Sequence, residues 1–207
     1  TAVYADGTQF QGQVVVTVVP AAASQYFNDL TGHTAETITA IDFLCDRGVT
    51  NGTGNGRYAP GDSIRRGDFC LMLWRAFQFD SGGAASGAFT DVPDSAYYAA
   101  AVNTLSSLQI VNGTGSNQFQ PNSTISRQDA AVMIQRTLQA AGMTADDGDL
   151  YALNAFSDGG EVSGYARTAL ACLIQQGLLR TSDGQLNPKA NLTRADMAVL
   201  LHRAMTR

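Results

Sequence analysis

The sequence contains very little lysine and glutamate. Its 207 residues include 16 Asp but only two Glu, and 12 Arg but only one Lys, and the net charge is −5. Proteins that bind nucleic acid need a basic face, so this balance argues against a nucleic acid partner. Any recognition of an anion must therefore be local, and arginine is the side chain best suited to such recognition because its donors form a rigid fork.

Cysteine and long apolar runs are also scarce. The three cysteines Cys45, Cys70 and Cys172 form no CxxC pair, which excludes a disulfide framework and a zinc site. No apolar run reaches the length of a membrane span, so we expect no membrane insertion. No secretory signal is visible, and the abrupt strand-like start predicts a fragment of a longer chain.

One pattern occurs three times, in residues 63–68, 124–129 and 191–196. In each copy an apolar residue is followed by an arginine and then by an aspartate, at the start of an amphipathic stretch. The three acids lie 61 and 67 residues apart, which indicates an internal repeat. The motif arginines are Arg66, Arg127 and Arg194, and the motif acids are Asp68, Asp129 and Asp196.

The spacing of this pattern is typical of a helix start. Ser126 and Thr193 each precede the motif acid by three residues, which is the capping-box arrangement. The acids are therefore interpreted as structural caps rather than catalytic groups. The same register places each motif arginine at the first helical position, where a cation is unfavourable by roughly 0.3–1 kcal/mol. A helix N-terminus beside an arginine can hold an anion, so three related anion sites are predicted.

The rest of the sequence repeats around this motif. Each unit opens with Phe-x-Asp and a first amphipathic helix, and a turn and a short extended piece ending in proline precede the motif helix. The turn is Gly-rich in the first two units but not in the third. A single helical hairpin cannot bury its own apolar stripe, but three can do so around a shared axis. The predicted units are residues 27–80, 89–142 and 156–207, joined by linkers at 81–87 and 140–150.

Residues 1–22 differ from the repeats. Tyr4–Thr8 carries a hairpin turn signal, and Gln13–Val19 is a β-branched run. We interpret this segment as the last strands of an immunoglobulin-like domain that lies upstream.

Taken together, the Phe-x-Asp opening, the Gly-Thr-Gly turn, the proline and the helix start resemble S-layer homology (SLH) domains, in three copies across residues 27–207. The resemblance implies a mainly α-helical fold, with three helical hairpins in a pseudo-threefold arrangement and grooves between the repeats. It also implies a bacterial surface protein at the cell wall or S-layer. The implied function is non-covalent binding of a peptidoglycan-linked secondary cell wall polysaccharide, typically one that carries pyruvate ketals, with no cofactor and no catalysis.

The resemblance also assigns candidate ligand-binding residues. A pyruvate ketal presents a carboxylate, and the three motif arginines match the arginine of the family motif. Backbone N–H groups of Gly52, Thr53, Gly113 and Thr114 are expected to approach a sugar, since glycine allows close contact. The last two candidates are Tyr97 and Tyr165, which stand where the family often has tryptophan. They could pack on a sugar face or seal the core. Unit one has Glu36 near the corresponding position, which predicts that the grooves do not bind equally.

Alternatives remain at this point. The arginines could instead form ion pairs between repeats, and the helical trimer could dock another protein or a self-assembling lattice. An enzyme is not expected, because neither Glu36 nor Glu161 lies in a motif and no nucleophile–base pair is legible. No metal site is expected, and Trp74 is interpreted as a packing residue.

Overall fold

The computed structural model describes residues 2–3, 9–10, 23–82, 87–143, 147–179, 181 and 183–207. Within these residues the chain is mainly helical. The α-helices are α1 (Ala35–Asp46), α2 (Arg66–Phe77), α3 (Ala99–Ser107), α4 (Arg127–Ala140), α5 (Arg167–Gln175) and α6 (Arg194–Met205). Short 3-10 helices precede α5: they are η1 (Leu150–Ala155), η2 (Gly159–Glu161) and η3 (Gly164–Ala166). Among the described helices, none has the length and apolar character that crossing a membrane requires.

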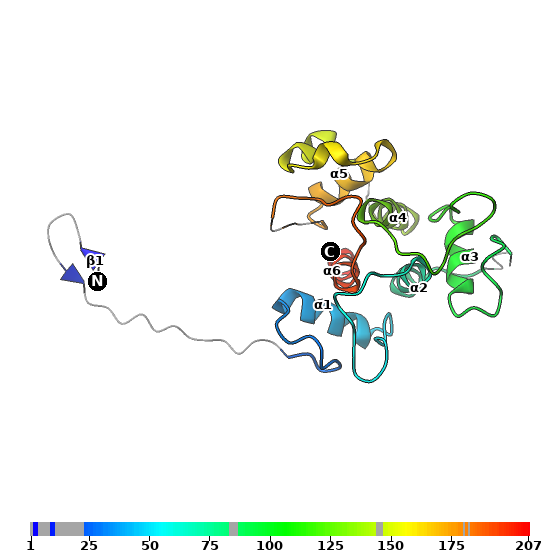
Figure 1. Ribbon diagram of the computed structural model, residues 1–207, viewed down its shortest axis with the longest axis horizontal. Helices are drawn as coiled ribbons and strands as arrows, with labels where there is room; N and C mark the ends of the chain where they lie inside the picture. Colours follow the sequence, from blue (N-terminus) through cyan, green and yellow to red (C-terminus); the bar gives the residue numbers. More distant parts are fainter. Residues whose placement is uncertain are drawn as a thin grey trace.

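The second helices of the three repeats form the centre of the fold. Figure 1 shows α2, α4 and α6 seen nearly end-on around a common axis, with α1, α3 and α5 outside them. Among the described α-helices, the pairs in closest contact cross the repeat boundaries, since α1 packs on α6, α3 on α2 and α5 on α4. The predicted arrangement of three helical units around one axis is therefore confirmed, and each repeat is completed by its neighbour.

A ring of three backbone hydrogen bonds joins the three repeats at the common axis. The N–H of Ile64 donates to the carbonyl of Leu192 at 2.9 Å, Leu192 donates to Ile125 at 2.9 Å, and Ile125 donates to Ile64 at 3.3 Å. All three side chains are buried. The apolar residue of each repeated motif thus joins the three repeats, because its backbone groups find their partners only in the other two.

The predicted helix starts are correct in register. Each motif arginine is the first residue of its helix, Ser126 and Thr193 accept from the N–H three residues on, and α6 has a full capping box with Asp196. In α2 the N-cap position is Arg65, which makes no side-chain capping bond.

The idea that these helix starts offer free N–H groups to an anion is wrong. The N–H of Arg66 donates to Ser123 and that of Gly67 to Pro121, both in the next repeat and both at 2.9 Å. In the same way, the first two N–H groups of α4 donate to carbonyls of repeat 3, and those of α6 donate to carbonyls of repeat 1. Since carbonyls of the neighbouring repeat already fill these positions, the first two N–H groups of each helix cannot bind an anion.

The aspartate of each Phe-x-Asp opening braces the extended piece before the proline. The carboxylate of Asp29 accepts from the N–H groups of Tyr58 and Ala59, at 2.9 and 2.8 Å. Desolvation opposes ionisation of this carboxyl, but the backbone donors prevail and lower the pKa of Asp29. Asp91 and Asp158 hold the corresponding pieces of repeats 2 and 3. This brace fixes the carbonyls that the motif arginines contact.

At the N-terminus, β1 (Ala2–Val3) pairs with β2 (Gln9–Phe10) in an antiparallel register, Ala2 opposite Phe10. The predicted turn at Tyr4–Thr8 and the run Gln13–Val19 lie outside the described residues, as do 83–86 and 144–146 of the two linkers. The immunoglobulin-like assignment stays a prediction.

Candidate functional site: three inter-repeat grooves

Three grooves of common design lie between the repeats, and each takes residues from all three. We name each groove after the repeat that supplies its central helix. The repeat-1 groove, about 360 Å³, is lined by Asn51, Gly52, Thr53, Asp68, Arg75, Tyr97 and Arg194. The repeat-2 groove, about 260 Å³, is lined by Arg66, Asn112, Gly113, Thr114, Asp129, Arg136 and Tyr165. The repeat-3 groove, about 160 Å³, is lined by Glu36, Arg127, Leu178, Leu179, Asp196 and Arg203.

The motif arginine of the repeat-2 groove is buried, and within the described residues it forms no ion pair. Arg66 is only 8% exposed, and its Nε donates to the carbonyl of Phe119 at 3.0 Å. A terminal nitrogen donates to the carbonyl of Asn112 at 3.3 Å, and the guanidinium lies 4.6 Å from the centre of the Phe119 ring. Carbonyls and a ring face orient this cation without neutralising it, so its charge remains available at the groove.

Arg194 has the same arrangement in the repeat-1 groove. Its Nε donates to the carbonyl of Tyr58 at 2.8 Å, its guanidinium lies 4.7 Å from the Tyr58 ring centre, and it is 9% exposed. In the described part of the chain, the ion pairs are Arg57–Asp29, Arg127–Asp196 and Arg203–Glu36. Neither Arg66 nor Arg194 is among them.

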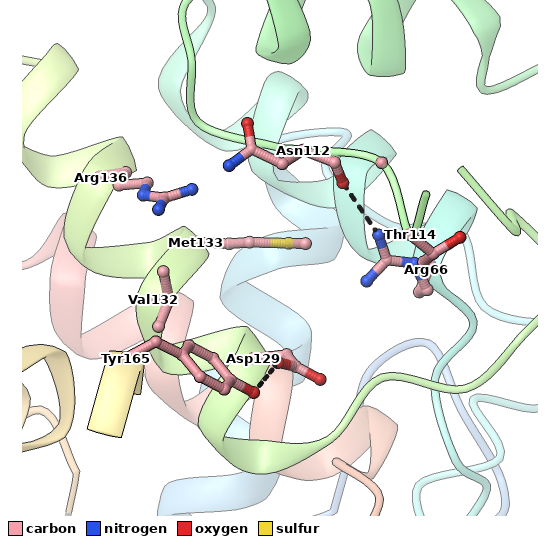
Figure 2. A pocket seen from close by; sticks show the side chains of 9 residues that line it. Arg66, Asn112, Thr114, Asp129, Val132, Met133, Arg136 and Tyr165 are labelled. Carbon is pink, nitrogen blue, oxygen red and sulfur yellow. Dashed lines mark hydrogen bonds between the residues drawn. The ribbon is translucent and has the colours of Figure 1, made fainter. Parts of the chain in front are cut away.

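A second arginine lines each groove from the central helix, nine positions after the helix start. In Figure 2 the guanidinium groups of Arg66 and Arg136 lie on opposite sides of the repeat-2 groove, with Met133 between them. Once the Asn112 amide is oriented to suit its neighbours, its oxygen accepts from Arg136 at 3.1 Å. Arg75 is the corresponding residue of the repeat-1 groove and is exposed. Each of these two grooves therefore holds two cations.

In each of these two grooves, a tyrosine from the next repeat donates a hydrogen bond to the carboxylate that lines the groove. The Tyr97 hydroxyl donates to Asp68 at 2.6 Å, and the Tyr165 hydroxyl donates to Asp129 (Figure 2). Desolvation and the hydrogen bond to the carboxylate raise the pKa of each tyrosine to about 12. The rings are 67% and 61% exposed, so they stand at the groove rim instead of sealing the core. The hydroxyl thus gives the acid a hydrogen-bond partner other than the arginines.

The repeat-3 groove is neutralised by its own acids. Arg127 donates through Nε to the carbonyl of Leu186 at 2.9 Å and forms an ion pair with Asp196 at 2.8 Å. Arg203 pairs with Glu36 at 2.7 Å. Both arginines that face this groove are therefore satisfied within the protein.

The Gly-Thr turns line the grooves, and the N–H groups of their threonines are bonded within each turn. The N–H of Thr53 donates to Arg57 at 2.8 Å and that of Thr114 donates to Gln118 at 2.7 Å, inside each turn. A Cβ on Gly113 would lie 2.6 Å from the Gln118 carbonyl oxygen and 2.8 Å from the Phe89 ring. Glycine is thus required where the turn packs on the ring, and the threonine N–H groups are not free for a sugar.

The predicted arginines, glycines, threonines and tyrosines line the grooves. Two further sets of residues were not predicted from the sequence. The first set is Asp29, Asp91 and Asp158, which the sequence shows as the repeated acid of the Phe-x-Asp opening but to which it assigns no role. The second arginines Arg75, Arg136 and Arg203 each lie seven residues after a motif acid, a recurrence that an aligned comparison of the repeats would have found. Among the described residues, no group of His, Cys, Asp and Glu is arranged to hold a metal ion.

Comparison with known proteins gives one consistent result. The family described as S-layer homology domain matches residues 26–70, 88–131 and 155–198. The chain is 29% identical over 195 residues to the surface-layer 125 kDa protein of Lysinibacillus sphaericus, covering 92% of this chain and 16% of that protein. It is 28% identical over 196 residues to S-layer protein EA1 of Bacillus anthracis, covering 93% and 22%. An amylopullulanase of Thermoanaerobacterium thermosulfurigenes is 27% identical over 185 residues, covering 87% and 10%. The chain thus spans a small part of each relative.

Proposed function

The chain belongs to the S-layer homology domain family, and from that premise we propose that it anchors a bacterial surface protein to the cell wall. The ligand is an anionic wall glycan, pyruvylated in our proposal, and it binds in the repeat-1 and repeat-2 grooves. The three binding units are residues 27–80, 89–142 and 156–207. The segment is a binding module without catalysis, as its match to surface-layer proteins and to a small part of an amylopullulanase supports.

One observation carries the choice of ligand charge. Arg66 and Arg194 are nine-tenths buried cations whose described partners are carbonyls and ring faces. Buried charges in proteins are normally paired with an opposite charge. A ligand carboxylate would complete this pairing with short, charge-assisted hydrogen bonds. The net charge of the chain is negative, so the attraction is confined to the grooves.

The proposal is tested by calorimetric titration with a pyruvylated wall disaccharide and with the same disaccharide lacking the ketal. We expect binding of the pyruvylated form alone, with about two sites for each chain. Equal binding of both sugars would remove the role assigned to the arginines.

Binding of neither sugar would overturn the pyruvylated-glycan proposal and favour protein docking or a different wall modification. A pull-down with purified cell wall sacculi, before and after chemical removal of the pyruvate, separates these two. Retention on both preparations indicates a different wall modification, and retention on neither favours protein docking.

A further inference from the structure

A second cavity adjoins the repeat-1 groove. It has a volume of about 500 Å³ and lies between the C-terminal ends of α1 and α2. Asn51 and Arg75 line both this cavity and the groove, so the two are continuous. The volume falls within the range of roughly 300–1,000 Å³ that is typical of small-molecule sites.

The cavity has an aromatic wall and a polar rim. Trp74 and Phe79 line it, and the indole Nε1 of Trp74 donates to the carbonyl of Phe79 at 2.9 Å, which fixes the ring. Arg47, which also lines the cavity, is held over the Phe43 ring at 3.5 Å from its centre. A rigid aromatic surface together with guanidinium and amide donors suits a ligand with one apolar face and a rim of hydroxyls.

This cavity is not a consequence of the repeated fold. Residue 74 corresponds to Gln135 in repeat 2 and to His202 in repeat 3, by the spacing of the motif acids. The Gln135 side chain is buried and directed to Asp147, and His202 packs edge-on against Phe43 at 4.7 Å between ring centres. Only repeat 1 places a tryptophan at this position, beside a groove that keeps its cations.

We propose that the cavity binds a neutral sugar ring of the same glycan, adjacent to the anionic sugar in the repeat-1 groove. This inference rests on the proposed function. The C–H face of the pyranose packs on Trp74, and Arg47 and Asn51 donate to its hydroxyls. A neutral ring is expected because the wall of the cavity is aromatic and its rim supplies hydrogen-bond donors for hydroxyls.

Trp74 is the only tryptophan of the chain, so its emission reports on this cavity directly. The probes are a pyruvate-ketal monosaccharide and a tetrasaccharide that carries the same ketal on a terminal sugar, prepared with the ketal at either end. We expect at least one tetrasaccharide to shift the Trp74 emission and the monosaccharide to leave it unchanged. Calorimetry should show Trp74→Ala weakening tetrasaccharide binding about tenfold at one of the two sites, with monosaccharide binding unchanged.

Trp74→Phe provides the matched variant, since it keeps an aromatic wall, and its tetrasaccharide affinity should stay within about threefold of the wild type. If both tetrasaccharides bind without an emission change and Trp74→Ala binds them normally, the cavity is not a subsite while the anchoring proposal stands. Equal weakening of monosaccharide and tetrasaccharide by Trp74→Ala would also overturn the inference, because it would show a structural effect on the groove. Absence of binding by every probe would overturn both proposals.

Discussion

The repeat-2 and repeat-3 grooves share one backbone design and differ in how their cations are satisfied. In the repeat-2 groove, Arg66 lies over an aromatic ring and Asp129 is held by a tyrosine. In the repeat-3 groove, Arg127 is paired with Asp196, and Arg203 is paired with Glu36. The first groove presents uncompensated positive charge and the second does not.

Two residue differences account for this contrast. Leu186 stands where repeats 1 and 2 have Tyr58 and Phe119, so Arg127 contacts an aliphatic residue where Arg194 and Arg66 contact aromatic ones. Glu36 stands where the other grooves have a tyrosine, so Asp196 pairs with Arg127 instead of accepting from a tyrosine hydroxyl, and an added acid neutralises Arg203. Conservation of the motif arginine is therefore not enough to make a binding groove, since the residues around the guanidinium decide whether it is still available.

The largest expected effect is a difference in glycan binding between the variants Arg66→Ala and Arg127→Ala. Arg66→Ala should remove one of two calorimetric sites, because a charge-assisted contact is worth about 1.5–3 kcal/mol, or roughly 10- to 150-fold in affinity. Arg127→Ala is the matched control, since each variant loses one Nε–carbonyl bond between repeats. It should leave both sites intact. Equal losses in the two variants would show that the arginines act only as structural links.

A smaller effect is expected from opening the repeat-3 groove. Glu36→Tyr combined with Leu186→Phe removes the acid on Arg203, offers Asp196 a hydroxyl and supplies a ring beneath Arg127. We expect a third calorimetric site, about tenfold weaker than the other two because the Gly-Thr turn is missing. Glu36→Gln alone is the control and should add no site, since Arg127 stays paired with Asp196. A stoichiometry that remains at two in the double variant would contradict our account of the contrast.

The role of the tyrosine hydroxyl at the groove rim can be tested by removing that single oxygen atom. Tyr165→Phe frees one oxygen of Asp129, which can then pair with an arginine of its own groove as Asp196 does. Loss of one hydrogen bond of about 0.5–1.5 kcal/mol should weaken binding at the repeat-2 groove roughly two- to tenfold. Tyr151→Phe is a suitable control because Tyr151 is 80% exposed and lies outside the grooves. Unchanged binding by Tyr165→Phe would mean that the hydroxyl does not keep the arginines available.

Much of this architecture follows from local patterns in the sequence. The helix starts, the caps at Ser126 and Thr193 and the three units depend on short-range spacing, which a single sequence displays. The assignment of arginines to grooves could not be made in this way, because each arginine crosses to the turn of another repeat. Arg127, for example, follows the regular Gly-Thr turn of repeat 2 in sequence but faces the repeat-3 groove.

The neutralisation of the repeat-3 groove was only partly visible for the same reason. The sequence displays Glu36 as a departure at the aromatic position, but its partner Arg203 lies 167 residues away. Likewise, the use of helix N-terminal N–H groups by the next repeat depends on how the repeats close into a ring. Long-range pairing of this kind is set by tertiary packing and leaves no mark on local spacing.

The smallest predicted effect is the pH dependence that the tyrosines of the repeat-1 and repeat-2 grooves contribute. The pKa values of Tyr97 and Tyr165 are raised to about 12, above the usual value near 10. Since the folded-state pKa is the higher one, the stabilisation from these phenols is fully present below pH 10 and is lost as the pH rises toward 12. The free energy of unfolding of the wild type minus that of a Tyr97→Phe, Tyr165→Phe variant should thus be constant from pH 7 to about 9.5 and then fall. Urea unfolding across this range measures the difference, and tyrosinate absorbance should show two late-titrating groups that the variant lacks. A difference that changes between pH 7 and 9 would contradict the assignment, because no raised phenol titrates there.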